Sequence, residues 1–444
     1  MRHALRGAAI TLEADPFLAG DPASLRHETD ALVIIDEGRI EAFGSFESLR
    51  YALIGADGTP IPVRQSGPHE LIAPGFIDSH VHYVQTPIIG AYGTQLIDWL
   101  ERHAFPAEAR CADAEHARRT ASAFLGECLR NGTTSGAVYC SVHPQSVDAF
   151  FTEASALGMR MMAGKVLMDR NVPASVRDTP QRSYDESQAL IDRWHGQGRL
   201  QYCITPRFAP TSSPEQMTLA GALWRANPGT YLQSHLAETL PELAWVRSLY
   251  PDRLDYLDVY DHYGQLGPRA IYGHGIHLSE REMARLHETG TSIAHCPTSN
   301  EFLASGACRV RDLKRADRPI RTGLATDLGG GTSFSPFATM LAAYRAAQAV
   351  GYSLSPVHAW YLATRGAAEA LRLEDRVGSI APGMEADLVL LDLASTPLIE
   401  RRLAECQTIE DQLFVQIVLA DDRAVRATWI AGVLHHERDE RHQP

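Results

Sequence analysis

The sequence predicts an α/β protein: a (β/α)8 TIM barrel with a small β-sandwich domain formed from both chain ends. Eight short apolar, β-like runs lie between about residues 70 and 330, and helix-like segments separate most of them. This alternation is typical of a (β/α)8 barrel. Two β-rich segments flank this long middle. In addition, residue types that bind metals stand at the ends of several of the runs.

The two ends of the chain have the same character. Residues 1–72 contain DALVIIDEGRIEAFG, in which two apolar stretches surround an Asp-Glu-Gly turn, the signature of a β-hairpin. Residues 375–444 contain the apolar run GMEADLVLLDL and a strand pair around Ala431-Gly432. We therefore expect 1–72 and 375–444 to pair into one composite β-sandwich domain, and 73–374 to form the barrel.

The middle of the chain supplies the strands and helices of the barrel. EQMTLAGALWRAN and SEREMARLHETG have the spacing of amphipathic helices. In a (β/α)8 barrel the active site lies at the carboxyl ends of the strands, so the residues that close each run are candidate site residues. The runs are, in order, HELIAPGFIDSHVH, TTSGAVYC, RMMAGKVLMD, LQYCITPRFAP, TYLQSHLAE, RAIYGHGIHLS, SIAHCPTSN and IRTGLATDLGGG.

Five of these closing residues suit a metal site. His80 and His82 are two residues apart on the first run, so both imidazoles face the same side of a strand. The fifth run closes with His235, the sixth with His274 and the eighth with Asp327. Four neutral imidazoles and one carboxylate suit Zn2+, and the same ligand argument admits Fe2+.

Glu238 follows His235 by three residues, in His-Leu-Ala-Glu. A carboxylate offset into the loop beside a metal ligand can take a proton from water and deliver it to a leaving group, so we expect a catalytic role. His277 lies three residues after His274 and therefore faces away from it on a continuous strand. His295 closes the seventh run, either as support for the site or as a hydrogen-bonded strand-end residue.

Composition excludes several classes of protein. Apolar residues make up 45% and charged residues 21%, which excludes a disordered chain, a coiled coil and a collagen-like fibre. The formal net charge of −13 argues against nucleic acid as a partner. No apolar run approaches the roughly 20 residues of a membrane helix. The seven cysteines form no C-x-x-C pair, and the start does not resemble a signal peptide, so we expect a cytoplasmic protein.

The segments PGFIDSHVH, HLAE, GHG and ATDLGGG resemble the amidohydrolase superfamily, metal-dependent (β/α)8 hydrolases with a β-sandwich built from both chain ends. The resemblance covers nearly the whole chain. Within the superfamily, the sequence is most similar to the bacterial guanine deaminases. The most specific features are the H-x-H-x-x-Gln start, the segment PRFAP and the glycine-rich TDLGGGTSFS.

The resemblance implies hydrolysis of guanine to xanthine and ammonia, with one Zn2+ per chain (Fe2+ is possible), free guanine and water as partners, and a homodimer. It implies that Glu238 shuttles protons and that Asp327 orients the attacking water. The implied metal ligands are His80, His82, His235, His274 and Asp327. The implied substrate contacts are His82, Gln85, Arg207, Phe208 and Glu238.

Simple structural roles remain open for Arg207, as an ion-paired strand-end residue, and for Phe208, as a core residue. A different substrate is the main alternative: a deaminase or chlorohydrolase acting on a pterin, a triazine or a modified purine. Ring-amide hydrolysis at a two-metal site would need a lysine on the fourth strand, whereas Lys165 belongs to the third. Finally, Glu301 replaces an apolar residue of the relatives, which leaves open the polarity of that part of the pocket.

Overall fold

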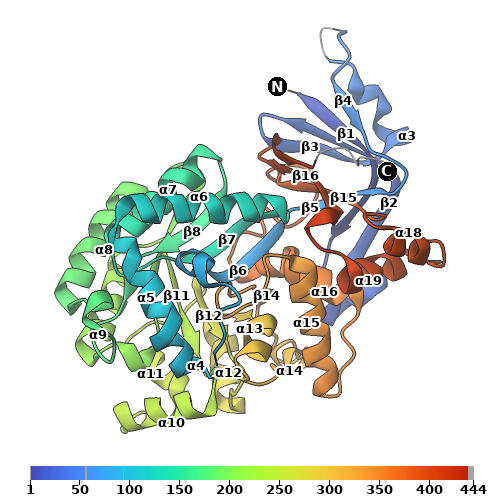
Figure 1. Ribbon diagram of the computed structural model, residues 1–444. Helices are drawn as coiled ribbons and strands as arrows, with labels where there is room; N and C mark the ends of the chain where they lie inside the picture. Colours follow the sequence, from blue (N-terminus) through green and yellow to red (C-terminus); the bar gives the residue numbers. More distant parts are fainter. Residues whose placement is uncertain (1, 56–57, 94, 439–444) are drawn as a thin grey trace.

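A computed structural model describes residues 2–55, 58–93 and 95–438. Figure 1 shows a barrel surrounded by helices and, beside it, a second domain in which blue strands from the start of the chain lie next to red strands from its end. The predicted fold class, a TIM barrel with a β-domain formed from both chain ends, is confirmed.

The barrel consists of parallel strands that follow one another in sequence order. Each of the eight predicted runs contains one of them. The first and last strands close the ring: the Ser79 hydroxyl donates to the Leu324 carbonyl (2.8 Å), and the Asp327 amide donates to the His80 carbonyl (3.0 Å). The strands are β6 (Phe76–His82), β7 (Thr133–Tyr139), β8 (Arg160–Gly164), β10 (Gln201–Pro206), β11 (Tyr231–Leu236), β12 (Ala270–His274), β13 (Ser292–His295) and β14 (Thr322–Leu324).

Helices between these strands cover the outside of the barrel (Figure 1). Both helices predicted from spacing are present. The second has a capping box formed by Ser279 and Glu282, and it ends at Gly290 in the left-handed conformation (φ 68°). The covering helices include α6 (Ala114–Arg130), α7 (Pro144–Ala156), α8 (Pro180–Trp194), α9 (Pro214–Ala226), α11 (Tyr256–His262), α12 (Glu280–Thr289) and α15 (Pro336–Ala349).

An apolar cluster fills the barrel beneath the carboxyl ends of the strands. It takes one buried side chain from each of seven barrel strands, together with residues of α17 (Arg365–Ala370). A cluster that nearly every strand of a ring contacts lies inside that ring, so the barrel is a packed core and not a channel. The strand residues are Ile77, Ala137, Met162, Cys203, Tyr231, Ile271 and Ala294.

The second domain is built on one mixed sheet with strand order β17-β16-β15-β5-β1-β2-β3, to which β4 adds by pairing with β1. Both predicted hairpins are present. Glu37 and Gly38 (φ 48° and 78°) turn the chain between β2 and β3, and Ala431 and Gly432 (φ 45° and 74°) do so between β16 and β17. The strands are β1 (His3–Leu12), β2 (Leu25–Asp36), β3 (Arg39–Ser45), β4 (Val63–Gln65), β5 (Glu70–Pro74), β15 (Leu388–Asp392), β16 (Val425–Ile430) and β17 (Val433–Glu437).

The chain passes from one sheet to the other at Gly75, between β5 and β6. The predicted run HELIAPGFIDSHVH therefore serves two sheets, because residues 70–74 pair with β15 and residues 76–82 pair with β7. The Gly75 amide donates to the Asp387 carbonyl (2.9 Å), and any side chain at this position would overlap Thr134. A glycine is required here because the two sheets approach each other at this point.

Buried ion pairs join the two domains. The guanidinium of Arg160, on β8, donates through Nε (2.8 Å) and Nη2 (2.5 Å) to the Glu385 carboxylate. Arg199 donates to the same carboxylate (2.9 Å) and to Asp387 (2.5 Å). Both partners in the Arg160–Glu385 pair are less than one-tenth exposed. Their charges therefore depend on each other for compensation.

Replacing Arg160 with methionine should destabilise the protein by about 3–5 kcal/mol, because the buried Glu385 carboxylate loses its bidentate partner. The urea midpoint followed by circular dichroism measures this loss. Replacing Arg118 with glutamine removes an exposed pair with Glu115 and serves as the control, with an expected change of about 0.5 kcal/mol or less. Equal midpoints for the two variants would contradict the prediction.

The same pair predicts a dependence of stability on pH. Burial raises the pKa of Glu385, but the guanidinium groups of Arg160 and Arg199 lower it by more, to below its ordinary value of 4.5. A carboxylate with a lowered folded-state pKa stabilises the fold fully above its unfolded pKa, and this contribution is lost as the pH falls through the folded value. Glu385→Gln should therefore flatten the fall in stability on acidification below pH 4.5, which urea titrations at several pH values measure.

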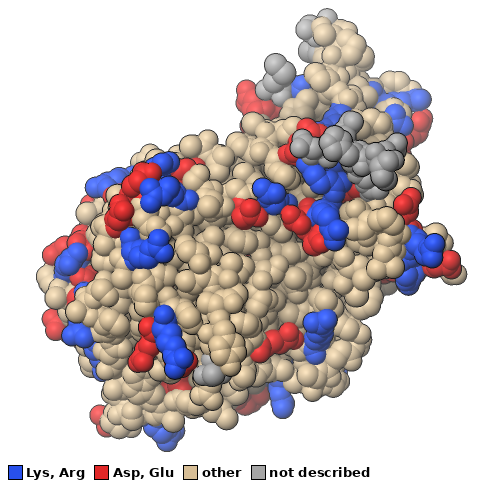
Figure 2. Space-filling model, in the orientation of Figure 1, with Lys and Arg blue, Asp and Glu red and all other residues tan. Residues whose placement is uncertain are grey.

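Charges are mixed on the surface. On the face drawn in Figure 2, basic and acidic side chains are interspersed, without a continuous patch of one sign. In the described part of the chain, no helix combines the length and the apolar character needed to cross a membrane. All seven cysteines fall within the described residues and are free thiols.

Candidate active site

Four of the five predicted metal ligands converge at the carboxyl end of the barrel. Ligand atoms of His80, His82, His235 and Asp327 all lie within 4.8 Å of one another, and every one of these side chains is buried. The Nε2 atoms of His82 and His235 are 3.2 Å apart. Asp327 Oδ1 is 3.4 Å from His80 Nε2 and 3.5 Å from His82 Nε2.

The fifth predicted ligand, His274, lies on the other side of the Asp327 carboxylate. Its Nε2 is 3.8 Å from Asp327 Oδ2 and 3.4 Å from Glu238 Oε2. It belongs to a second compact group with His80, Asp327 and Cys296. Burial raises the pKa of the Cys296 thiol well above its ordinary value. Cys296 was not among the ligands predicted from the sequence.

The local backbone explains why these residues face one another. His80 and His82 alternate along β6 and so point the same way. His274 closes β12 and Asp327 follows β14, and both adopt the left-handed region with φ of 73° and 48°. This conformation is costly for residues other than glycine and is found mainly at functional sites. Here it turns both side chains toward the barrel axis.

Two hydrogen bonds fix the orientation of the imidazoles. His235 Nδ1 donates to the carbonyl oxygen of Arg207 (2.7 Å), and His274 Nδ1 donates to Asn300 Oδ1 (2.8 Å). In each ring the proton is thereby placed on Nδ1, and the lone pair on Nε2 faces the cluster. Asn300, on α13 (Pro297–Phe302), was not predicted as part of the site.

The electrostatics keep most of these imidazoles neutral. Burial lowers the pKa of His80, and it lowers those of His82 and His235 further, with Arg207 and the neighbouring rings contributing. Burial also lowers the pKa of His274, but the Glu238 and Asp327 carboxylates raise it by more. Burial raises the pKa of Asp327, whereas its contact with His80 and the nearby imidazoles brings it down to about 2.

The donor set fits a divalent metal ion. His80 Nε2 and His274 Nε2 are buried and have no hydrogen-bond partner among the described residues. Buried polar atoms without partners are rare in folded proteins, and here they face an ionised carboxylate and further ring nitrogens. Neutral imidazoles with a carboxylate are the ligands that Zn2+ and Fe2+ take in proteins.

Glu238 lies in the loop after β11, beside the cluster. Its Oε1 accepts a hydrogen bond from the Ser305 hydroxyl (2.9 Å), and its main-chain amide donates to Glu242 Oε2 (2.8 Å). Burial raises the pKa of Glu238 above its ordinary value, and the charges of Glu242 and Asp327 add to this effect. Glu242, on α10 (Leu240–Leu249), also accepts from the Tyr256 hydroxyl (2.8 Å), so it holds the loop that carries Glu238.

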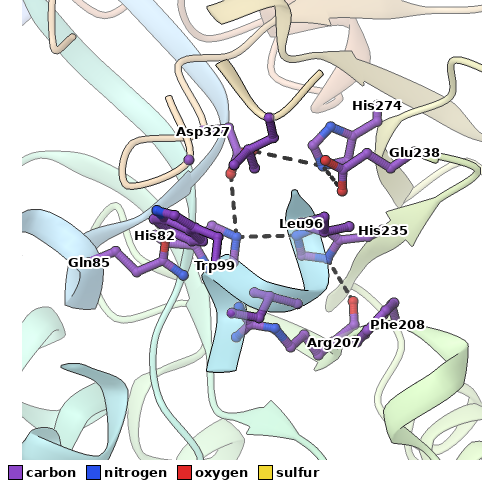
Figure 3. Close-up of a pocket in the computed structure, with 13 residues that line it drawn as sticks. His82, Gln85, Leu96, Trp99, Arg207, Phe208, His235, Glu238, His274 and Asp327 are labelled. Atoms are coloured by element: carbon purple, nitrogen blue, oxygen red, sulfur yellow. Dashed lines mark hydrogen bonds and ion pairs between the residues drawn. The ribbon is translucent and has the colours of Figure 1, made fainter. Parts of the chain in front are cut away.

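A pocket opens onto the cluster, and Figure 3 shows the side chains around it. Metal-binding residue types line one side and an apolar wall lines the other. The lining residues are His82, Gln85, Leu96, Trp99, Leu100, Arg207, Phe208, His235, Glu238, His274, Leu303, Asp327 and Gly330.

All five residues expected to contact the substrate line this pocket: His82, Gln85, Arg207, Phe208 and Glu238. Arg207 is both a pocket residue and an ion-paired strand-end residue, because it donates from Nη1 to both oxygens of Glu108 (2.7 and 2.8 Å). Gln85, on the 3-10 helix after β6, donates from Nε2 to Glu108 Oε1 (2.9 Å). Phe208 packs against Trp245 and His235 at the pocket wall, so it is also part of the core.

The other residues singled out in the sequence lie outside the pocket lining. His277 is bonded to the Ser305 carbonyl oxygen (3.0 Å). His295 is buried, and neither of its ring nitrogens has a hydrogen-bond partner among the described residues. Lys165 is paired with Asp178 and, at 3.3 Å, with Glu186. Glu301 is exposed, so it does not set the polarity of the pocket.

The site also contains residues that the sequence analysis did not identify. Three of them, Leu96, Trp99 and Leu100, line the pocket. The fourth, Glu108, contacts Gln85 and Arg207 without lining the pocket, and all four come from the segment between β6 and α6. This segment holds α4 (Leu96–Trp99), a π-helix (Leu100–Ala104) and α5 (Phe105–Ala109). They lie on helices and not at strand ends, so the rule that located the other residues does not apply to them. A π-helix at a pocket wall is itself a feature of functional sites.

Comparison with known proteins adds independent findings. A profile of the amidohydrolase family matches residues 71–434. The chain is 46% identical to the guanine deaminase of Escherichia coli (strain K12) over 94% of this chain and 93% of that one. The E. coli guanine deaminase structure matches with a TM-score of 0.95, covering 98% of this chain and 100% of that one at 45% identity. A guanine deaminase structure from C. acetobutylicum, with guanine bound in its active site, matches with a TM-score of 0.87 at 27% identity, covering 98% and 100%.

Proposed function

The chain belongs to the amidohydrolase family, and on that basis we propose that it is a guanine deaminase that hydrolyses guanine to xanthine and ammonia. The observation that carries this proposal is the arrangement of a single pocket. Glu238 and the histidine–aspartate cluster form one side, and Gln85 and Arg207 line the same cavity. Such a pocket can hold a polar planar heterocycle against a group that activates water. The similarity to guanine deaminases over nearly the full chain supports guanine as that heterocycle.

The proposed metal is one Zn2+ per chain, with Fe2+ suited to the same donors. The residues that would hold it are His80, His82, His235, His274 and Asp327. When bound, such an ion supplies a water activated at neutral pH and withdraws electrons from atoms that develop negative charge. Asp327 has a second role, because its carboxylate can orient the attacking water by accepting a hydrogen bond.

Glu238 moves the protons. Its Oε2 lies 3.4 Å from His274 Nε2, at the edge of the cluster, and Ser305 holds its other oxygen at 2.9 Å. From this position the carboxylate can take one proton from the attacking water and pass it to a purine ring nitrogen. It can then take the second proton of that water, now on the new C–OH group, and deliver it to the amine as the C–N bond breaks. A raised pKa suits a group that must both accept and return a proton near neutral pH.

The apolar wall and the polar pair orient the substrate. Trp99, Leu100 and Leu303 supply surface that packs against a planar ring and excludes bulk water. Arg207 and Gln85 supply hydrogen bonds that fix the ring in one register relative to the cluster. His82 and Glu238 complete the proposed substrate contacts, at the end of the pocket where the amino group would leave.

A substrate panel tests the proposed function. Metal-loaded enzyme should release one ammonia for each guanine consumed, with xanthine as the second product, measured by absorbance and by an ammonia assay. A pterin and an aminotriazine form the other arms of the panel. Turnover of either in place of guanine would overturn the assignment of substrate while leaving the hydrolytic reaction in place.

Asn300→Leu should weaken metal binding by about 10–100-fold, because it removes the acceptor that holds the His274 proton on Nδ1. Metal competition with a fluorescent chelator measures this change without reference to turnover. Asn300→Asp keeps an acceptor oxygen and is the matched control. If the leucine and aspartate variants bound metal equally well, Asn300 would have no part in orienting His274.

We further propose that the enzyme acts in purine degradation, in the cytoplasm and as a homodimer. The seven free thiols support a reducing compartment. The homodimer is based on the family resemblance, and sedimentation equilibrium at micromolar concentration tests it, with a monomer mass as the contradicting result.

A further inference from the structure

Glu108 is a buried carboxylate that has no part in the proposed metal site or proton transfer. It lies on α5, is fully buried and does not line the pocket. Its Oε1 accepts hydrogen bonds from Gln85 Nε2 (2.9 Å) and Arg207 Nη1 (2.7 Å), and its Oε2 accepts from Arg207 Nη1 (2.8 Å). The main-chain carbonyl oxygen of Glu108 accepts a hydrogen bond from the Ser141 hydroxyl (3.0 Å), which connects α5 to the loop after β7. Glu108 thus contacts both polar residues proposed to hold the substrate.

This contact determines the orientation of the Gln85 amide, that is, which of its two polar atoms faces Glu108. Both oxygens of the Glu108 carboxylate accept from the Arg207 guanidinium, and Oε1 also accepts from Gln85 Nε2, so the amide nitrogen of Gln85 is held toward Glu108 and its oxygen is directed elsewhere. Within the described residues, no group donates to Gln85 Oε1. The backbone of Gly329 (φ 114°) packs against this amide so closely that a side chain there would overlap it. Gln85 lines the pocket, so its free amide oxygen is the acceptor that it offers there.

Glu108 acts on Arg207 in a similar way. It engages Nη1, and the main-chain carbonyl of Arg207 is occupied by His235 Nδ1. The Nε and Nη2 groups donate to no side chain or carbonyl in the described part of the chain, so they remain available as donors. Because Gln85 and Arg207 bind the same carboxylate, they lie side by side and offer the pocket one acceptor next to a pair of donors.

A lactam edge, an N–H next to a C=O, complements this arrangement. An amidine edge, a ring nitrogen lone pair next to an amino group, has the opposite polarity and would place lone pair against lone pair and donor against donor. We infer that Glu108 is a positioning residue that sets the hydrogen-bond polarity of the pocket and so selects heterocycles with a lactam edge over amino-substituted ones. This inference rests on the proposed function, since guanine carries a lactam edge next to its reacting C–NH2 group.

The test measures binding of two unreactive purines to the metal-loaded enzyme by isothermal titration calorimetry. Hypoxanthine has the lactam edge without the 2-amino group, and adenine has the opposite polarity. The wild-type enzyme should bind hypoxanthine at least about tenfold more tightly than adenine, because adenine would leave the polar groups of Gln85 and Arg207 mismatched. In Glu108→Gln the new amide can donate to Gln85 Oε1, so the Gln85 amide can rotate to the opposite orientation. The ratio of the affinities for hypoxanthine and adenine should then fall toward one.

Control variants separate polarity from packing. Glu108→Asp keeps a group that can only accept, so both affinities should fall by a similar factor while the preference remains. Glu282→Gln removes a buried carboxylate on α12, outside the pocket lining, and should leave both affinities unchanged. If Glu108→Gln does not fold, Gln85→Met removes the acceptor while the Glu108–Arg207 pair stays intact, and it should also abolish the preference.

Two results would overturn the inference. The first is a wild-type enzyme that binds both purines equally. The second is a folded Glu108→Gln variant that keeps the wild-type preference or, if that variant does not fold, a Gln85→Met variant that keeps it. Neither result depends on turnover. An enzyme that prefers hypoxanthine but releases no ammonia from guanine would contradict the proposed function alone. Conversely, an enzyme that deaminates guanine while Glu108→Gln keeps the preference would contradict only the role of Glu108.

Discussion

Replacing Glu238 with glutamine should lower kcat for guanine by about 10²–10⁴-fold while the enzyme keeps its metal. The amide has nearly the shape of the carboxylate and can still accept the hydrogen bond from Ser305, but it cannot carry a proton. If Glu238 moves protons, the loss is therefore in kcat and not in folding. Steady-state kinetics, with metal content by mass spectrometry and the melting temperature, distinguish these outcomes.

Glu301→Gln is the matched control for this experiment. It makes the same chemical change at an exposed glutamate outside the pocket lining, so kcat and KM should remain at wild-type values. A Glu238→Gln enzyme that retained most of its activity would contradict the assignment of the proton shuttle. A variant without metal would show instead that Glu238 contributes to holding the ion.

Removing the metal should abolish turnover, and restoring Zn2+ should recover it. Chelated enzyme has lost the group that activates water, and the remaining side chains cannot ionise water at neutral pH. Because the ion binds only the folded site, its removal should also lower the melting temperature. Metal analysis before and after reconstitution should give about one ion per chain, as expected for a site with one set of ligands.

His80→Ala should reproduce the effect of chelation in a form that added metal does not reverse. It deletes one of the buried nitrogens that face Asp327 at 3.4 Å. His287→Gln, at an exposed histidine on α12, is the control and should leave metal content and activity unchanged. Two ions per chain in the wild-type enzyme would contradict a mononuclear site, and full activity in the His80 variant would contradict the proposed ligand set.

Much of the barrel could be predicted because its strands are short and apolar and alternate with helices. Each of the eight runs contains a strand of the observed ring. One feature was hidden: the run around Gly75 belongs to two sheets. Both halves of that run are buried, so hydrophobic periodicity does not change where the chain crosses. The boundary is set by the close approach to Thr134 and the hydrogen bond to Asp387, and both contacts come from distant parts of the sequence.

The residues of the site also divide into those that could be predicted from the sequence and those that could not. His80, His82, His235, His274 and Asp327 could be found because barrel geometry sends every strand end to one face. Glu108 could not, because its position depends on how α4 and α5 fold back over that face. In the sequence, a glutamate in a short helical segment looks the same as a solvated surface residue. Contacts between separate helices are set by tertiary packing, which local sequence patterns do not record.

The pairing of β5 with β15 has a consequence for biosynthesis. The two strands join residues 70–74 to residues 388–392, so the inner edge of β5 stays open until nearly the whole chain has left the ribosome. An apolar edge strand exposed for that time is a template for pairing with other chains. The early release of a truncated product would therefore yield a species prone to aggregate, even if its barrel had folded.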